Sequence, residues 1–255
     1  MRVQRFAATA SLGCFVLSAA IGLTASNGAR FGWWDYETGL KILAPGVVAA
    51  LGGVLSGALW LARALNLNNS AGWRRGAIGL AGSLVAAFIP LDQLRLYFVS
   101  PPIHDITTDV EYAPAFSALL ALRGAASNGP EYDGMKLVDY GGRKSHVAAV
   151  QKKAYPDIRA VLLLEKPSIL FWRGFETAKR MTAWNIVAFD EKDGMIEATT
   201  ASLWFGLTSD IAIRVKPAGK MGARLDIRAK SRTGQNDMAM NASIVRDYIK
   251  ALQGR

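Results

Sequence analysis

A dense group of polar side chains lies near the C-terminus, where residue types and spacing suit binding or acid–base chemistry. Between residues 223 and 248 an alternating strand pattern runs into a turn and then into a helix start. With one carboxylate upstream, the candidate binding or structural motif comprises Asp210, Arg228, Ser231, Arg232, Asn236, Asp237 and Asn241. No nucleophile–base pattern is recognisable among these residues, so we assign no catalytic residue.

The motif has two interpretations. In the first, free amides at the helix start join Arg228, Lys230 and Arg232 in a site for a lipid phosphate or a cell-wall carboxylate. In the second, the two arginines pair with Asp210 or Asp237, and Asn236 or Asp237 caps the helix. The second interpretation describes an internal ion-pair network. Asp237 favours it, because a carboxylate at the helix start already occupies the place of an anion.

The sequence lacks the residues that a disulfide, a metal site, a catalytic pair or a nucleic-acid-binding site would require. The single cysteine, Cys14, leaves neither a disulfide within the chain nor a multi-cysteine metal site. Ser145 and His146 are neighbours in sequence, and neighbouring side chains rarely face each other as a catalytic pair does. No basic run with interleaved aromatics indicates nucleic-acid binding. We therefore expect no metal, no cofactor and no nucleic-acid partner.

Charge is distributed unevenly along the 255 residues. Residues 1–94 carry seven Lys or Arg and three Asp or Glu, whereas residues 95–255 carry twenty-three and seventeen. The first part has the composition of a membrane region and the second that of a soluble domain, so we divide the chain into 1–98 and 99–255. The net charge of +10 suits attraction to an anionic lipid or an anionic envelope polymer.

The N-terminal region contains three apolar runs, at residues 6–26, 42–62 and 76–94. About twenty residues of helix cross a hydrocarbon core of about 30 Å, so each run predicts a transmembrane helix. The second run includes Gly53 and Gly57, a spacing of small residues that lets helices approach closely. That face is a candidate contact with a membrane protein partner.

Orientation follows from the positive residues beside these helices. Five arginines fall on one side of the predicted spans, namely Arg2, Arg5, Arg63, Arg74 and Arg75, against Arg30 and Lys41 on the other. Lys and Arg concentrate on the cytoplasmic side, so the N-terminus is predicted to be cytoplasmic. Three spans then place the C-terminal domain in the periplasm, and we expect a multi-pass protein of the bacterial inner membrane.

The C-terminal region alternates strand and helix patterns. We predict strands at 160–164, 184–189, 195–201, 210–216 and 224–230, and helices at 114–122, 167–182 and 237–252. Residues 124–151 show little periodicity and are interpreted as a long loop. The order favours an α+β domain, an antiparallel sheet of four to six strands with helices on one face. The other face would be open and basic, with Asp226 embedded in it.

Four segments resemble a family of bacterial and plastid proteins called domain of unknown function 1499. These segments are 103–108 (IHDITT), 154–158 (AYPDI), 200–210 (TASLWFGLTSD) and 228–241 (RAKSRTGQNDMAMN). The resemblance covers residues 100–252 and departs from the family pattern at Ala239 and Met240, where a glycine is expected. It implies this fold and membrane attachment, and it implies no particular activity.

Three classes of function remain open. The favoured class is a membrane-anchored cell-envelope protein whose exported domain binds a lipid, an envelope polymer or a protein. The second is an envelope hydrolase or transferase that uses Asp210, Asp226 or Asp237 as a base. The third is a subunit of a larger membrane complex.

The predicted orientation has a direct test. Alkaline phosphatase fused after residue 100 should be active, because the enzyme acquires its disulfides only outside the cytoplasm. The same fusion placed after residue 68, between the second and third spans, is the matched control and should be inactive. An inactive fusion at residue 100 together with an active one at residue 68 would reverse the assignment.

Overall fold

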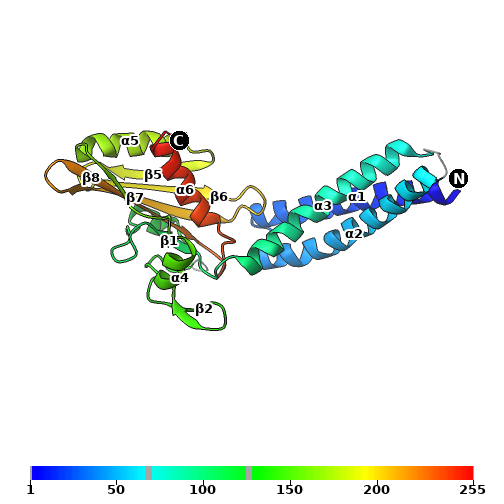
Figure 1. Cartoon of the computed structure of the whole chain (residues 1–255), viewed down its shortest axis with the longest axis horizontal. Helices are drawn as coiled ribbons and strands as arrows, with labels where there is room; N and C mark the ends of the chain where they lie inside the picture. Colours follow the sequence, from blue (N-terminus) through cyan, green and yellow to red (C-terminus); the bar gives the residue numbers. More distant parts are fainter. Residues whose placement is uncertain (1, 67–70, 125–127, 255) are drawn as a thin grey trace. The chain divides into compact units, whose positions relative to one another are not determined.

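A computed structural model describes residues 2–66, 71–124 and 128–254 (Figure 1). The chain divides into two compact units. One comprises Met1–Arg95 with Leu203–Gly206, and the other comprises Leu96–Ser202 with Leu207–Arg255. We call them the helical unit and the sheet unit.

Three long helices form most of the helical unit. They are α1 (Arg2–Arg30), α2 (Tyr36–Asn66) and α3 (Trp73–Val99), the last of which runs into the sheet unit. Each is long and apolar enough to cross a membrane, so the three predicted apolar runs lie in helices of sufficient length to be membrane spans. The helices extend past the predicted apolar runs, because a helix can continue through charged residues at its ends.

Small residues lie where these helices meet. Gly53 and Gly57 are buried in the helical unit, and the hydroxyl of Ser11 donates a hydrogen bond to the Gly53 carbonyl (2.8 Å). A Cβ atom at Gly57 would lie 2.7 Å from the Cβ of Leu80. The face predicted to contact a membrane partner therefore packs within the chain itself, where glycine allows close approach.

The sheet unit is built on six antiparallel strands. They are β1 (Asp105–Thr107), β4 (Val161–Leu163), β5 (Trp184–Asp190), β6 (Met195–Ala201), β7 (Thr208–Ala218) and β8 (Gly222–Ser231). Their order is β1-β8-β7-β6-β5, and β4 also pairs with β8, beside a different part of that strand from β1. Strand β8 is therefore the one that three others pair with, and β5 lies at the far edge.

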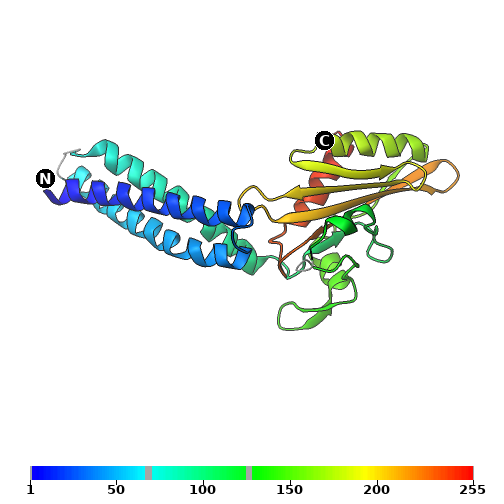
Figure 2. The same cartoon turned by 180° about the vertical axis from the view of Figure 1, so that it is seen from behind.

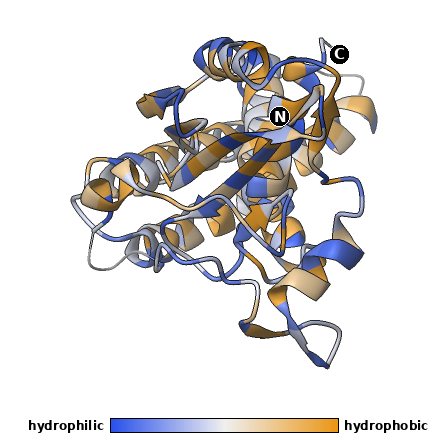
Figure 3. Cartoon of the chain, turned by 90° about the vertical axis from the view of Figure 1, so that its left-hand side faces the viewer, coloured by the Kyte–Doolittle hydropathy of each residue, from blue (hydrophilic) through white to orange (hydrophobic). Residues whose placement is uncertain are grey.

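One face of this sheet carries the apolar core. Helices α5 (Pro167–Arg180) and α6 (Met240–Leu252) cover it, as Figures 1 and 2 show from opposite sides. Alternate residues of β7 and β8, such as Ile213 and Ile227, are fully buried there, and hydrophilic and hydrophobic bands alternate along the ribbons in Figure 3. The α+β class with helices on one face is confirmed.

The prediction of a long loop over residues 124–151 is wrong for the second half of this range. A short hairpin lies there, with strands β2 (Leu137–Asp139) and β3 (Lys144–His146), followed by helix α4 (Val147–Ala154). Gly141 and Gly142 both have positive φ and make the hairpin turn. Strands of three residues are too short to show a period, so the sequence pattern did not reveal them. Residues 118–122, predicted within a helix, form a 3₁₀ helix, η1 (Ala118–Leu122).

Candidate functional site

The face of the sheet opposite α5 and α6 is covered, contrary to the open basic face expected from sequence. Its cover consists of residues 109–124 and 128–133, which we call the cover segment. Glu197 of β6 fixes part of it, because its carboxylate accepts backbone hydrogen bonds from Ser117, Ala118 and Leu119, each at 3.0 Å. Four charged side chains of β7 and β8 are therefore enclosed between the sheet and this segment, namely Asp210, Asp226, Arg228 and Lys230.

Arg228 lies at the centre of the enclosed layer, with 2% of its surface exposed. It makes a two-pronged ion pair with Asp105 of β1, in which Nε and Nη2 donate to the two carboxylate oxygens at 2.8 Å each. Its remaining donors reach the carbonyls of Pro114, Pro130 and Glu131 in the cover segment. A buried guanidinium is tolerated when its donors have such partners.

Aromatic rings complete the surroundings of this arginine. The guanidinium carbon lies 4.4 Å from the centre of the Phe116 ring and 5.6 Å from that of Tyr132. Both contacts are cation–π interactions, which strengthen when water is excluded. Burial raises the pKa of the Tyr132 hydroxyl well above its usual range, so this ring stays neutral beside the ion pair.

Lys230 is fully buried beside Arg228. Its amine lies 2.9 Å from Asp133 and 3.3 Å from Asp105, and it donates to the Glu131 carbonyl. Burial alone would raise the pKa of Asp133, but hydrogen bonds from His104, Lys136 and Lys230 hold it well below its usual range. Asp133 is therefore a permanent anion that balances the buried lysine.

Asp210 forms a second buried ion pair. It accepts hydrogen bonds from Arg232 at 2.8 and 2.9 Å and a short one from Arg123 of the cover segment. The predicted pairing of Arg232 with Asp210 is confirmed. The prediction that Arg228 pairs with Asp210 or Asp237 is wrong, because Arg228 pairs with Asp105 instead.

The remaining motif residues organise the start of α6. Asp237 accepts hydrogen bonds from the amides of Ala239 and Asn241, both at 2.9 Å, and Asn236 accepts one from the amide of Met238. The side-chain amide of Asn241 donates to the hydroxyl of Ser231 and to the His104 carbonyl. These contacts join the last strand, the last helix and the segment before β1.

Two further details concern this turn. Burial raises the pKa of Asp237 to about 6, although the hydrogen bonds that its carboxylate accepts from two backbone amides act to lower this pKa. The amides expected to bind an external anion are thus already bonded to the chain's own carboxylate. Asn236 also donates to the carbonyl of Tyr97 in the same unit, at 2.9 Å.

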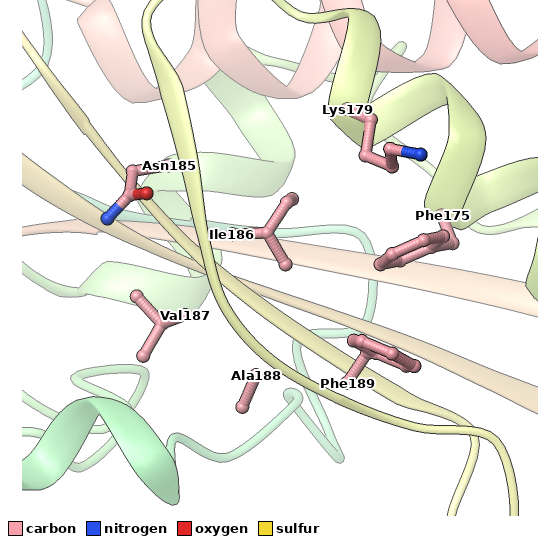
Figure 4. Close-up of a pocket in the computed structure, with 7 residues that line it drawn as sticks. All are labelled: Phe175, Lys179, Asn185, Ile186, Val187, Ala188 and Phe189. Carbon is pink, nitrogen blue, oxygen red and sulfur yellow. The ribbon is translucent and has the colours of Figure 1, made fainter.

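The structure also shows a surface feature that the sequence did not reveal. A groove of about 630 Å³ lies between α5 and the edge strand β5, lined by Phe175, Lys179 and residues 185–189 (Figure 4). Ile186 and Phe175 project toward the same space, and the rings of Phe175 and Phe189 lie 4.6 Å apart. The edge position of β5 depends on the order of all the strands, which no local pattern encodes.

Among the residues that the structure describes, no group of three or more His, Cys, Asp or Glu side chains is placed to hold a metal ion. Comparison with known families gives one result. The family model described as "Protein of unknown function (DUF1499)" matches residues 105–252, more than half of the chain. A search of curated proteins finds no match.

Loss of the buried Arg228 should destabilise the protein far more than loss of an arginine in a surface ion pair. Arg228→Met should lower the free energy of unfolding by about 3–5 kcal/mol, because it leaves the buried Asp105 with only Lys230 at 3.3 Å and removes the donors to three carbonyls of the cover segment. Arg246→Met is the matched control, since Arg246 makes a similar two-pronged pair with Asp157 on the surface. There the loss should be about 1 kcal/mol or less. Denaturant unfolding of the full chain in detergent measures both, and equal losses would contradict the assignment.

Two substitutions by glycine near the start of α6 should affect stability differently, because the backbone conformation differs between the two positions. Ala239 has a φ of 65°, a left-handed conformation that costs L-residues about 1–2 kcal/mol. Ala239→Gly should therefore leave stability unchanged or raise it by up to about 1 kcal/mol, even though glycine is more flexible when unfolded. Ala242→Gly, three residues on within the helix, should lower stability by about 1 kcal/mol or more. Thermal unfolding of both variants checks the difference, and destabilisation by Ala239→Gly would contradict it.

Proposed function

The chain belongs to the DUF1499 family, and we propose that it is a membrane-anchored cell-envelope protein whose exported domain binds a protein partner. One observation carries the proposal. The charged motif is internal to the sheet unit, whereas the groove between α5 and β5 is open at its surface. A concave, mainly apolar surface with few polar groups is the usual form of a binding site.

The alternatives receive less support from the same geometry. A hydrolase or transferase would need Asp210, Asp226 or Asp237 to reach a substrate, and all three are buried and hydrogen-bonded within the chain. A site for a lipid phosphate or an envelope polymer at the motif would need unbonded cationic groups. Arg228 and Lys230 are instead enclosed with carboxylates of the chain.

Location is a further part of the proposal. Three helices able to cross a membrane support membrane attachment. The excess of arginine beside the first and third helices supports a cytoplasmic N-terminus and a periplasmic sheet unit in a bacterial inner membrane. A periplasmic domain held at the membrane meets other envelope proteins at high local concentration, because attachment confines it to a thin layer.

Site-specific photocrosslinking tests the binding surface. A photoreactive phenylalanine analogue replaces Phe189, which is 53% exposed in the groove, in cells that express the full chain. The same analogue at Met221, 81% exposed in the turn between β7 and β8, is the control. We expect a protein adduct at position 189 alone, identified by mass spectrometry and recovered again by copurification with the unmodified chain.

Other results would overturn the proposal. Lipid adducts alone at position 189 would favour the lipid-binding alternative. Identical protein adducts at positions 189 and 221 would indicate random collisions.

A further inference from the structure

The outer edge of β5 has no strand partner in the described part of the chain, where only β6 pairs with this strand. An edge strand presents a row of backbone amides and carbonyls that suit another extended segment. A register shift between Ile186 and Ala188 interrupts the edge. The added segment would therefore be short, and the interruption protects the edge against unlimited pairing.

Helix α5 adds an exposed aromatic surface beside this edge. Phe175 and Phe189 contact each other, and the ring of Trp172 lies 6.2 Å from that of Phe189. Both Trp172 and Phe189 remain about half exposed despite this packing. Every second side chain of an added strand would project to the α5 side of the sheet, where this aromatic surface can bury an apolar group.

Charge differs between the two ends of the groove. Lys179 and Arg180 end α5 beside the start of β5, and the only carboxylate bonded to Lys179 among the described residues is Glu176, in an exposed pair at 3.1 Å. At the other end Asp190 accepts backbone hydrogen bonds in the turn before β6. Exposed pairs such as Lys179–Glu176 contribute little, so the lysine can exchange its partner.

We propose that the groove binds an extended, acidic segment of another protein as a strand antiparallel to β5. An apolar side chain of the segment packs on Phe175 and Phe189, and a carboxylate pairs with Lys179. A C-terminal carboxylate beside Lys179 requires this direction, because an antiparallel strand that begins beside Asp190 ends beside Lys179. Either an acidic side chain or the C-terminal carboxylate of the segment suits that position. This inference rests on the proposed protein-binding function.

A second copy of the chain is the other candidate for this edge. Antiparallel pairing of two β5 strands about a twofold axis would place Asp190 of each copy beside Lys179 of the other, so the contact itself would have complementary charges. Two copies that each carry a net charge of +10 repel each other as they approach, whereas an acidic segment is attracted to the chain. We therefore favour the acidic segment, and a dimer is one of the outcomes that the test distinguishes.

The test uses the full chain in detergent micelles and a displayed library of random heptapeptides with free C-termini. We expect enriched peptides that combine an apolar residue with a terminal carboxylate or an acidic residue. Lys179→Glu should weaken a recovered peptide at least tenfold, and replacing the peptide's acidic residue by lysine, or its terminal carboxylate by an amide, should recover binding to that variant. Lys179→Gln removes the charge only and should give an intermediate loss. Lys250→Glu, an exposed lysine on α6, is the matched control and should change nothing.

Three results would overturn the inference. They are enrichment no greater than that of an unrelated membrane protein, peptide binding that is equal in Lys179→Glu and the unaltered chain, and a dimer that Phe189→Lys dissociates. Failure with peptides while the crosslinked protein at position 189 persists would leave the protein-binding function in place. It would show that the partner presents a folded surface instead of an extended segment.

Discussion

Arginine keeps its charge inside a protein, so Arg228 obliges the surrounding chain to supply an anion and several acceptors. Asp105 supplies the anion, and three carbonyls of the cover segment supply acceptors. Strand β1 is only three residues long and owes its position to this pair as well as to backbone bonds with β8. The pair between residues 105 and 228 thus joins the cover segment, strand β1 and the motif on β8.

Local signals in the sequence predicted most of the fold. Three apolar runs revealed the helices of the helical unit, and alternation revealed β5 to β8 because those strands have seven residues or more. The partner of Arg228 could not be predicted in this way, since Asp105 lies 123 residues away and is recognised only when β1 pairs with β8. The left-handed turn at Ala239 escaped prediction because the residue is neither glycine nor asparagine.

In the sheet unit the paired charged residues lie inside, whereas the proposed binding surface at β5 lies outside. Its polar face is filled by ion pairs whose members are within the chain, and such pairs define one arrangement even where an apolar layer would be equally stable. The edge at β5, where only β6 pairs with this strand in the described part of the chain, combines an unpaired strand edge with exposed aromatic side chains. Among the motif residues, Asn241 and Ser231 join α6 to β8 by a hydrogen bond, and α5 and α6 pack on the same apolar face of the sheet.

The central position of β8 has a consequence for the order of assembly. Three strands pair with it, and it is the last strand to be synthesised. Until residues 222–231 emerge, β1 and β4 have no neighbour, and Asp105 has no counterion. The long sequence separation makes closure slow, since the intervening loop must lose its freedom first. A chain without residues 222–231 would leave β1 and β4 without their partner strand, and unpaired strand edges of this kind favour aggregation.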